Sequence, residues 1–411
     1  MSLEPHAASA VPSGSGRSNV VLQVLPALVT GGVERGTVEL AGALVEAGWT
    51  ALVASSGGHM VRELDRIGVK HIQLPLHSKN PLVMRANIGR LADVIREHDV
   101  DIVHARSRAP AWSAFYAARA TGSHFVTTFH GTYNLGLMGL KNAYNAIMTR
   151  GERVIAISHF IADHIQAVYR TDPERIRVIH RGVDLSRFDP ARISQERIIQ
   201  LAQRWRLPDG YPVVMLPGRL TRWKGQTVLI EALARLGRKD IRCLLVGSDQ
   251  GREAYTDELK SLVERRGLQD VVHIVGDCND MPAAYMLTDV VVSASTDPEA
   301  FGRVIVEGQA MGRPVVATNN GAARENVLDG RTGRLVPPGD PEALAAALAA
   351  ALAIGPEERE RRAALALKFV RDNFSRELMC ARTLGVYSEV LGQSGDGSES
   401  QAAWAGNSAS L

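Results

Sequence analysis

The sequence of 411 residues is poor in cysteine and in aromatic side chains, and its charges nearly cancel. Its three cysteines, Cys243, Cys278 and Cys380, show no metal-ligand spacing and stand in apolar or loop contexts. We therefore predict structural thiols of a reducing compartment. A net charge of +3 argues against nucleic acid as a main partner. It leaves open a basic patch that meets anionic lipid.

Long apolar runs are also missing. The longest, residues 343–354, is rich in alanine and too short to span a bilayer. Residues 1–18 lack a basic region followed by an apolar core, so we expect no signal peptide and a disordered extension. Residues 393–411 have too few apolar side chains to pack, and we expect a disordered tail. These features favour a cytoplasmic protein and leave open peripheral contact with the cytoplasmic face of the membrane.

Short apolar runs alternate with helical segments along the rest of the chain, which is typical of doubly wound parallel sheets. One series of runs lies within residues 19–157 and includes residues 71–75. A second begins at Val213, recurs at residues 242–246, 273–275 and 290–293, and ends near Ala317. The chain is also too long for one ordinary core. We predict an α/β fold with a first domain over residues 19–187, a second over residues 188–374, and a linker near residues 185–194.

A predicted strand-to-helix turn carries two carboxylates, Glu299 and Glu307, separated by seven residues. The free N–H groups and the dipole at the start of a helix suit a diphosphate, and a glycine lets the backbone approach it closely. Each carboxylate could accept hydrogen bonds from sugar or ribose hydroxyls. The alternative is an exposed loop glutamate and a helix-start glutamate without a ligand. The backbone positions predicted to bind the donor are Phe301, Gly302, Arg303 and Val304.

A basic turn follows the predicted strand at Val213 and precedes a helix. Arg219 offers a bidentate fork and Lys224 a mobile charge, and both would lie at the carboxyl end of a strand, where open α/β sheets bind ligands. A basic turn by itself is usually solvated surface. Together with the carboxylate pair, it predicts a site for a sugar diphosphate.

In their order and spacing these motifs resemble the retaining GT-B glycosyltransferases of family 4, over residues 19–391. The chain is similar to bacterial enzymes that build lipopolysaccharide cores and other surface glycans. The resemblance implies two Rossmann-like domains that face each other across a cleft, with a last helix at about residues 375–392 that crosses back to the first domain. Other motifs that carry it are Gly31-Gly32-Val33-Glu34-Arg35, Phe129-His130-Gly131, Ala156-Ile157-Ser158, His180-Arg181-Gly182-Val183-Asp184, Asp329-Gly330 and Thr332-Gly333.

The glycine turn at Gly31 and Gly32 also raises the alternative of a dinucleotide-binding enzyme. The turn is not G-x-G-x-x-G, and the second predicted strand ends at Ser55 and Ser56 without an acid for a ribose diol. Within the resemblance, Gly32 brings the loop close to the donor phosphates or the acceptor, and Gly31 lies on the acceptor side. A tight turn that only closes a helix onto the sheet is the other interpretation.

His130 follows an apolar strand and precedes a glycine, so it should face the cleft. A neutral imidazole there could hydrogen-bond a sugar hydroxyl, and the resemblance implies a catalytic histidine. His104 also ends a strand, and we favour a structural role for it. No histidine pair has zinc-like spacing, so we predict no metal and no other cofactor.

Residues 132–150, which include Tyr133 and Lys141, mix apolar and basic side chains after the histidine. They are either a helix packed on the core or an acceptor-side surface that meets a lipid-linked substrate or the membrane.

The sequence thus predicts a retaining, metal-independent transfer from a nucleotide-diphosphate sugar to a glycan or lipid-linked acceptor. Arg219, Lys224, Glu299 and His130 would be catalytic, and Glu307 would hold the ribose. The backbone near Asp277 and Cys278 would read the base, whose identity stays open. The rival interpretations are a nucleotide-sugar epimerase of the same fold and a non-catalytic scaffold. Arg181 and Arg324 depart from the asparagine and the proline common in the family.

Overall fold

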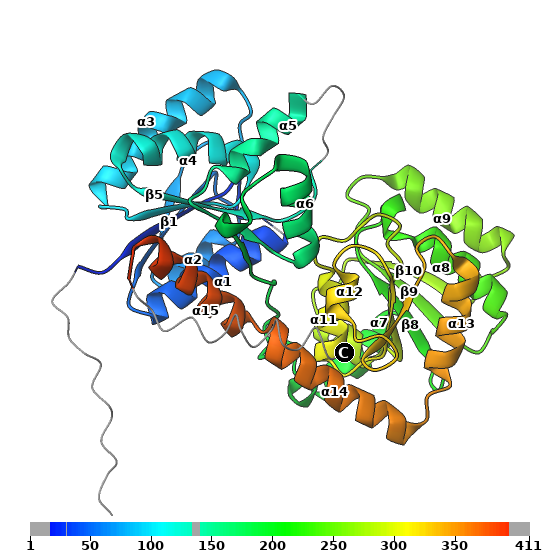
Figure 1. Cartoon of the computed structure of the whole chain (residues 1–411). Coiled ribbons are helices and arrows are strands. Elements are labelled where there is room, and N and C mark those ends of the chain that lie inside the picture. The colour runs from blue at the N-terminus through cyan, green and yellow to red at the C-terminus, as the bar shows by residue number, and fades with distance from the viewer. Residues whose placement is uncertain (1–16, 30, 134–139, 394–411) are drawn as a thin grey trace, which may run out of the picture.

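The computed structural model describes residues 17–29, 31–133 and 140–393. Nearly all of the predicted extension and tail, and residues 134–139 of the acceptor-side segment, lie outside this part of the chain. The described residues form two parallel sheets with helices around them, one in each half of the molecule (Figure 1). This confirms the predicted fold class.

The first sheet has seven strands in the order β3-β2-β1-β4-β5-β6-β7. Val21 and Leu22, neighbours in the third strand of this order, are buried on opposite faces of the sheet. Val21 lies in an apolar cluster with side chains of residues 32–46, 61–66 and 376–390, and Leu22 lies in one with side chains of residues 81–97 and 108–121. The strands are β1 (Val20–Val24), β2 (Thr50–Ser55), β3 (Lys70–Gln73), β4 (Ile102–Ala105), β5 (His124–Phe129), β6 (Arg153–Ala156) and β7 (Ile176–Val178). The helices are α1 (Gly32–Glu46), α2 (Val61–Arg66), α3 (Pro81–Glu97), α4 (Arg108–Thr121), α5 (Leu140–Asn145) and α6 (His159–Tyr169).

The second sheet has six strands in the order β10-β9-β8-β11-β12-β13. Apolar side chains of α8, α9 and α13 cover one face, and those of α10 and α11 cover the other. The strands are β8 (Val213–Pro217), β9 (Arg242–Val246), β10 (Val272–Gly276), β11 (Val290–Ser293), β12 (Val315–Thr318) and β13 (Gly333–Val336). The helices are α7 (Gln195–Arg204), α8 (Gln226–Leu236), α9 (Glu253–Arg265), α10 (Met281–Met286), α11 (Arg303–Ala310), α12 (Ala323–Asn326), α13 (Pro341–Leu352), α14 (Pro356–Phe374) and α15 (Arg376–Val390).

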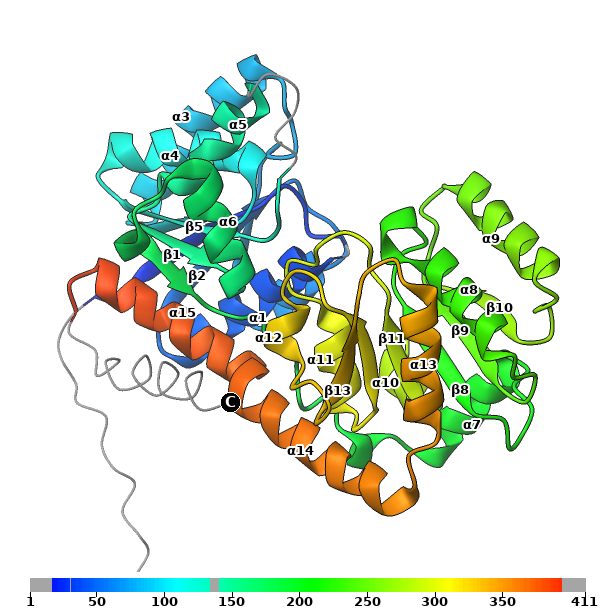
Figure 2. The same cartoon turned by 45° about the vertical axis from the view of Figure 1, so that its right-hand side comes forward.

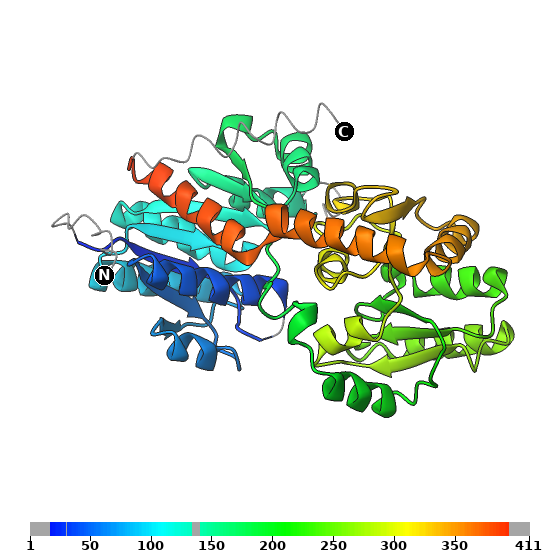
Figure 3. The ribbon, with the colours of Figure 1, turned by 90° about the horizontal axis from the view of Figure 1, so that it is seen from below.

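The last two helices join the halves. α14 lies on the second half, and α15 continues from it along the first (Figures 2 and 3). Tyr387 of α15 is fully buried and hydrogen-bonds to His104 of β4 over 2.6 Å. At the surface, Glu389 pairs with Arg153 and Arg177 of the first sheet. The end of the chain therefore completes the cover of the first sheet.

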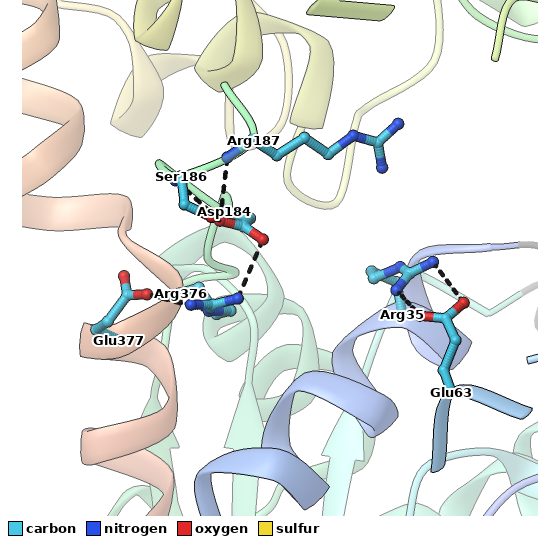
Figure 4. Close-up of polar contacts among 7 residues, drawn as sticks. All are labelled: Arg35, Glu63, Asp184, Ser186, Arg187, Arg376 and Glu377. Atoms are coloured by element: carbon cyan, nitrogen blue, oxygen red, sulfur yellow. Dashed lines mark hydrogen bonds and ion pairs between the residues drawn. The ribbon is translucent and has the colours of Figure 1, made fainter. Parts of the chain in front are cut away.

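The chain passes between the halves twice, and the two passages touch. Val183 donates its N–H to the Phe374 carbonyl over 2.8 Å, and Arg376 donates its N–H to the Val183 carbonyl over 3.0 Å. Beside them the Asp184 carboxylate accepts from Ser186, Arg187 and the Arg376 guanidinium (Figure 4). Although burial opposes it, these contacts lower the pKa of Asp184. We call residues 182–188 and 374–376 the double crossing.

Candidate active site

The order of the second sheet creates a crevice at the carboxyl ends of β8 and β11. The chain leaves β8 toward β9 and β10 on one side, then returns to place β11 on the other side. Such a reversal is where open α/β sheets bind ligands. The basic turn follows β8, and the carboxylate turn follows β11, so the fold brings together the two segments that the sequence singled out.

Gly225 allows the basic turn to lie against the end of β11. Its φ of 72° is left-handed, and a Cβ at this position would overlap the Ala294 carbonyl. The close approach puts Lys224 in direct ion pairing with Glu299, and Ser295 also donates to that carboxylate over 2.6 Å. Arg219 is exposed at the same edge. The predicted phosphate cation and the predicted sugar carboxylate are thus partners in this structure.

The helix that follows, α11, begins directly after Gly302, whose φ is 79°. The backbone of Arg303 and Val304 therefore forms the first turn of the helix. Phe301 lies differently from the other predicted donor-binding residues: its ring is 4% exposed and packs against Phe374, with centroids 5.8 Å apart. Its ring is therefore closed to a ligand, and its carbonyl oxygen accepts a hydrogen bond from the Asn326 amide.

Glu307 lies one turn into α11 and already has two partners. Arg303 pairs with one carboxylate oxygen over 3.0 Å, and the Tyr285 hydroxyl donates to the other over 3.0 Å. Burial and the Glu307 charge raise the pKa of Tyr285 well above its ordinary value, so it remains a donor. A carboxylate has further lone pairs, so these contacts fix its orientation and leave capacity for a diol.

The predicted base-reading residues lie farther along the same edge. Asp277 is exposed and Cys278 half-buried in the loop after β10. Burial raises the pKa of the Cys278 thiol, and all three cysteines are free thiols.

Gly32 of the first half faces this crevice. Gly31 precedes α1 and Gly32 begins it. A Cβ built on Gly32 would overlap the Arg181 guanidinium and would lie 3.7 Å from Cδ of Arg303, which belongs to the other half. The glycine turn is thus packed between one arginine from each side of the cleft. Behind it, Arg35 and Glu63 form an ion pair between α1 and α2 (Figure 4).

His130 lies just beyond the end of β5, on the cleft side of the first sheet. The Arg181 guanidinium lies 2.9 Å from Nδ1 of the ring, whereas the buried Nε2 has no hydrogen-bond partner in the described part of the chain. Burial, Arg181, Arg106 and His104 together lower the pKa of His130 well below its ordinary value. The imidazole is therefore neutral near pH 7. Sequence reasoning noted Arg181 only as a departure from the family and missed this contact.

His104 has a structural place in the fold. Its Nδ1 lies 2.6 Å from the Tyr387 hydroxyl and its Nε2 lies 2.7 Å from the Thr128 hydroxyl, so both ring nitrogens have protein partners. Burial lowers its pKa well below the ordinary value.

The predicted acceptor-side residues Tyr133 and Lys141 lie in different environments. The Tyr133 ring packs on Phe129 and lies under the Arg108 guanidinium, 4.1 Å from its centroid. Burial raises the pKa of Tyr133 to about 12. Lys141, by contrast, is exposed on α5.

One cluster joins the halves beside the cleft. Glu325 of α12 accepts the N–H groups of His159 and Phe160, both over 2.8 Å, and lies 2.8 Å from Nε2 of His180. Both carboxylate oxygens thereby cap the start of α6, a helix of the other half. Among the described residues, Glu325, His159 and His180 form the group of three side chains whose possible metal-binding atoms lie close together. The cap already explains the arrangement, and the prediction of no metal stays a prediction.

Comparison with known proteins identifies the family. Residues 30–187 match the model for Glycosyltransferase Family 4, and residues 198–368 match that for Glycosyl transferases group 1. A D-inositol 3-phosphate glycosyltransferase of Salinispora tropica is 32% identical over 342 residues, which cover 76% of this chain and 67% of the relative. With its two facing sheets, the chain belongs to the GT-B glycosyltransferases of family 4.

Solved structures agree with this. A glycosyltransferase of Rickettsia africae is 41% identical with a TM-score of 0.86, covering 92% of this chain and all of its own. HepE of Anabaena, solved with UDP, is 25% identical with a TM-score of 0.77, covering 91% of this chain. The chain spans about half to two thirds of the length of the curated relatives it matches, for example 58% of the D-inositol 3-phosphate glycosyltransferase of Xylanimonas cellulosilytica. No helix among the described residues is long and apolar enough to cross a membrane.

Proposed function

We propose that the protein transfers a sugar from a nucleotide-diphosphate sugar to a glycan or lipid-linked acceptor and retains the anomeric configuration. The observation that carries the proposal is the meeting of Arg219, the Lys224–Glu299 pair and the start of α11 at the β8/β11 crevice. These groups offer two cations and free amides to a diphosphate. Glu299 offers oxygens to sugar hydroxyls.

In this proposal the leaving diphosphate gains negative charge as its bond to the anomeric carbon breaks. Arg219, Lys224 and the helix dipole stabilise that charge without a metal. The acceptor oxygen bonds to the anomeric carbon on the same face, and the acceptor proton passes to the leaving phosphate. Glu307, oriented by Arg303 and Tyr285, holds the ribose diol.

Two similarities to known proteins narrow the choice of substrates to test. HepE binds UDP, which supports a uridine diphosphate sugar as the first donor. The curated relatives are named for an inositol phosphate acceptor, which supports an anionic acceptor. Lipopolysaccharide or surface-glycan synthesis, at the cytoplasmic face of the membrane, is the setting we propose.

The test is transfer in excess EDTA, after thermal-shift screening of nucleotides has identified the base. We expect activity to survive the chelator, because the diphosphate has protein cations. We expect NMR to show the α-linkage of an α-configured donor kept in the product. An inverted product would overturn the mechanism, and loss of all activity with EDTA would overturn the metal-free site. Release of a modified sugar without an acceptor would instead identify an epimerase.

A further inference from the structure

The contact between Arg181 and His130 fixes which ring nitrogen carries the proton. A guanidinium has N–H donors and no acceptor, so the histidine nitrogen beside it must accept. That nitrogen is Nδ1, 2.9 Å from Nη2 of Arg181. A neutral imidazole has one N–H, which is then on Nε2.

We infer that Arg181 is a positioning residue that holds His130 as the neutral Nε2–H tautomer, which makes His130 a hydrogen-bond donor toward the cleft and not a general base. Nε2 is buried and has no partner in the part of the chain that the structure describes, so its N–H is available to a ligand oxygen. The tautomer assignment is independent of the proposed function, and only the identity of the ligand that accepts this hydrogen bond rests on it.

Three further observations support the arrangement. Burial and the neighbouring Arg303 and Arg106 lower the pKa of Arg181 to about 9, so it remains charged and a donor at neutral pH. A cation at this distance opposes protonation of the ring. The adjoining cavity has a volume of only about 30 Å³, which is too small for a phosphate between the two side chains.

The charges around the pair come from several elements and are of both signs. Arg181 and His130 face two acids of α1, one arginine of the opposite half, and a histidine and an arginine near the end of β4. These groups are Glu34, Glu39, Arg303, His104 and Arg106. Burial raises the pKa of Glu39. Burial, Arg181, Arg106 and His104 together lower the pKa of His130.

Gly32 leaves the space that the Arg181 guanidinium occupies beside His130. A side chain at Gly32 would occupy the place of the Arg181 guanidinium. Its backbone does not have a positive φ, so alanine is tolerated there and the flexible arginine has to move. Gly32→Ala is thus a second way to remove the contact while Arg181 stays in the chain.

The Nε2–H tautomer of His130 restricts where the acceptor proton can go. With Nδ1 occupied by Arg181 and Nε2 already protonated, His130 has no lone pair for the acceptor proton. That proton must go elsewhere, and in the proposed function the leaving phosphate oxygen takes it. An asparagine in place of Arg181 could donate the same hydrogen bond but would not oppose protonation of the ring by its charge.

The test is ¹⁵N NMR of the histidine rings in the full chain, assigned with His130→Gln. The wild-type signal should report the Nε2–H tautomer from pH 5.5 to pH 8. Arg181→Met and Gly32→Ala should give a tautomer mixture and an imidazolium that forms at higher pH, and Arg181→Lys should restore the wild-type spectrum. Arg313→Met, at a half-buried arginine of the other half, is the control and should change nothing at His130.

A wild-type Nδ1–H or imidazolium signal at pH 7 would overturn the inference, and so would an unchanged His130 signal in both Arg181→Met and Gly32→Ala. The spectra need no substrate, so they test the tautomer of His130 independently of the proposed transfer activity. In transfer assays we expect Arg181→Met to lower kcat/KM by about tenfold or more, with the greater loss on the acid side.

Discussion

Lys224 and Arg181 are both enclosed cations at the cleft, one in each half, but their partners differ. Lys224 pairs with the carboxylate of Glu299, whereas Arg181 donates to the neutral ring of His130. A ligand phosphate and a ligand hydroxyl can together replace the two partners of the first pair, because each charged group gains an equivalent contact. The second pair offers no such exchange. In the second half, a bound ligand can therefore replace the contact between Lys224 and Glu299. In the first half, Arg181 keeps His130 in one protonation state.

The largest loss of activity should come from removing the cations of the second half. We expect Lys224→Ala and Arg219→Ala each to lower kcat by roughly 10²-fold or more, because each removes charge stabilisation that grows in the transition state. Steady-state kinetics decide this. Arg222→Ala is the matched control from the same turn, since Arg222 is exposed and pairs with Glu258. Rates near wild type for both variants would remove the crevice as the phosphate site.

A smaller effect should separate the two carboxylates. We expect Glu307→Ala to weaken binding of the free nucleoside diphosphate by about tenfold, the size of one lost hydrogen bond to a charged group. Glu299→Ala should leave that affinity nearly unchanged and damage transfer, because its proposed partner is the sugar. Calorimetry with the diphosphate alone distinguishes them. Equal losses in the two variants would contradict the division of roles.

The smallest effect should be a loss of stability on removing the charge of Glu325, which caps α6 of the other half. Although burial opposes it, the hydrogen bonds from His180, Phe160 and His159 lower the pKa of Glu325. Its contribution to stability is thus present above the ordinary glutamate value of 4.5 and is lost as the pH falls through the lower folded value. We expect Glu325→Gln to cost about 1 kcal/mol at pH 7 and less at pH 3.5.

Urea unfolding at the two pH values measures this difference. Glu360→Gln, at an exposed carboxylate, should have little effect at either pH. A loss for Glu325→Gln that is the same at both pH values would show that the charge of the cap contributes nothing.

The buried strands could be predicted from the sequence, and so could the edge strands β3 and β10, but the other two edge strands could not. The runs at 242–246 and 290–293 match β9 and β11 residue for residue. β7 and β13 lie at sheet edges and are only partly buried, so neither has a continuous apolar run, and both were missed. Arg219, Lys224, Glu299 and Glu307 could be proposed from the sequence because their turns have local signals. The pairing of Lys224 with Glu299, and of Arg181 with His130, depends on residues 75 and 51 positions apart. No local pattern reports such contacts.

The double crossing has a consequence for the integrity of the molecule. Gly182 passes so close to Arg376 that a side chain at Gly182 would overlap its backbone, and the two segments exchange main-chain hydrogen bonds. A protease that cut residues 182–188 would divide the chain into two polypeptides, because its three cysteines are free thiols. α15 would stay covalently attached to the second half, so its contacts with the first sheet would have to hold the two polypeptides together. Because both segments meet at one place, both covalent connections between the halves lie at a single position.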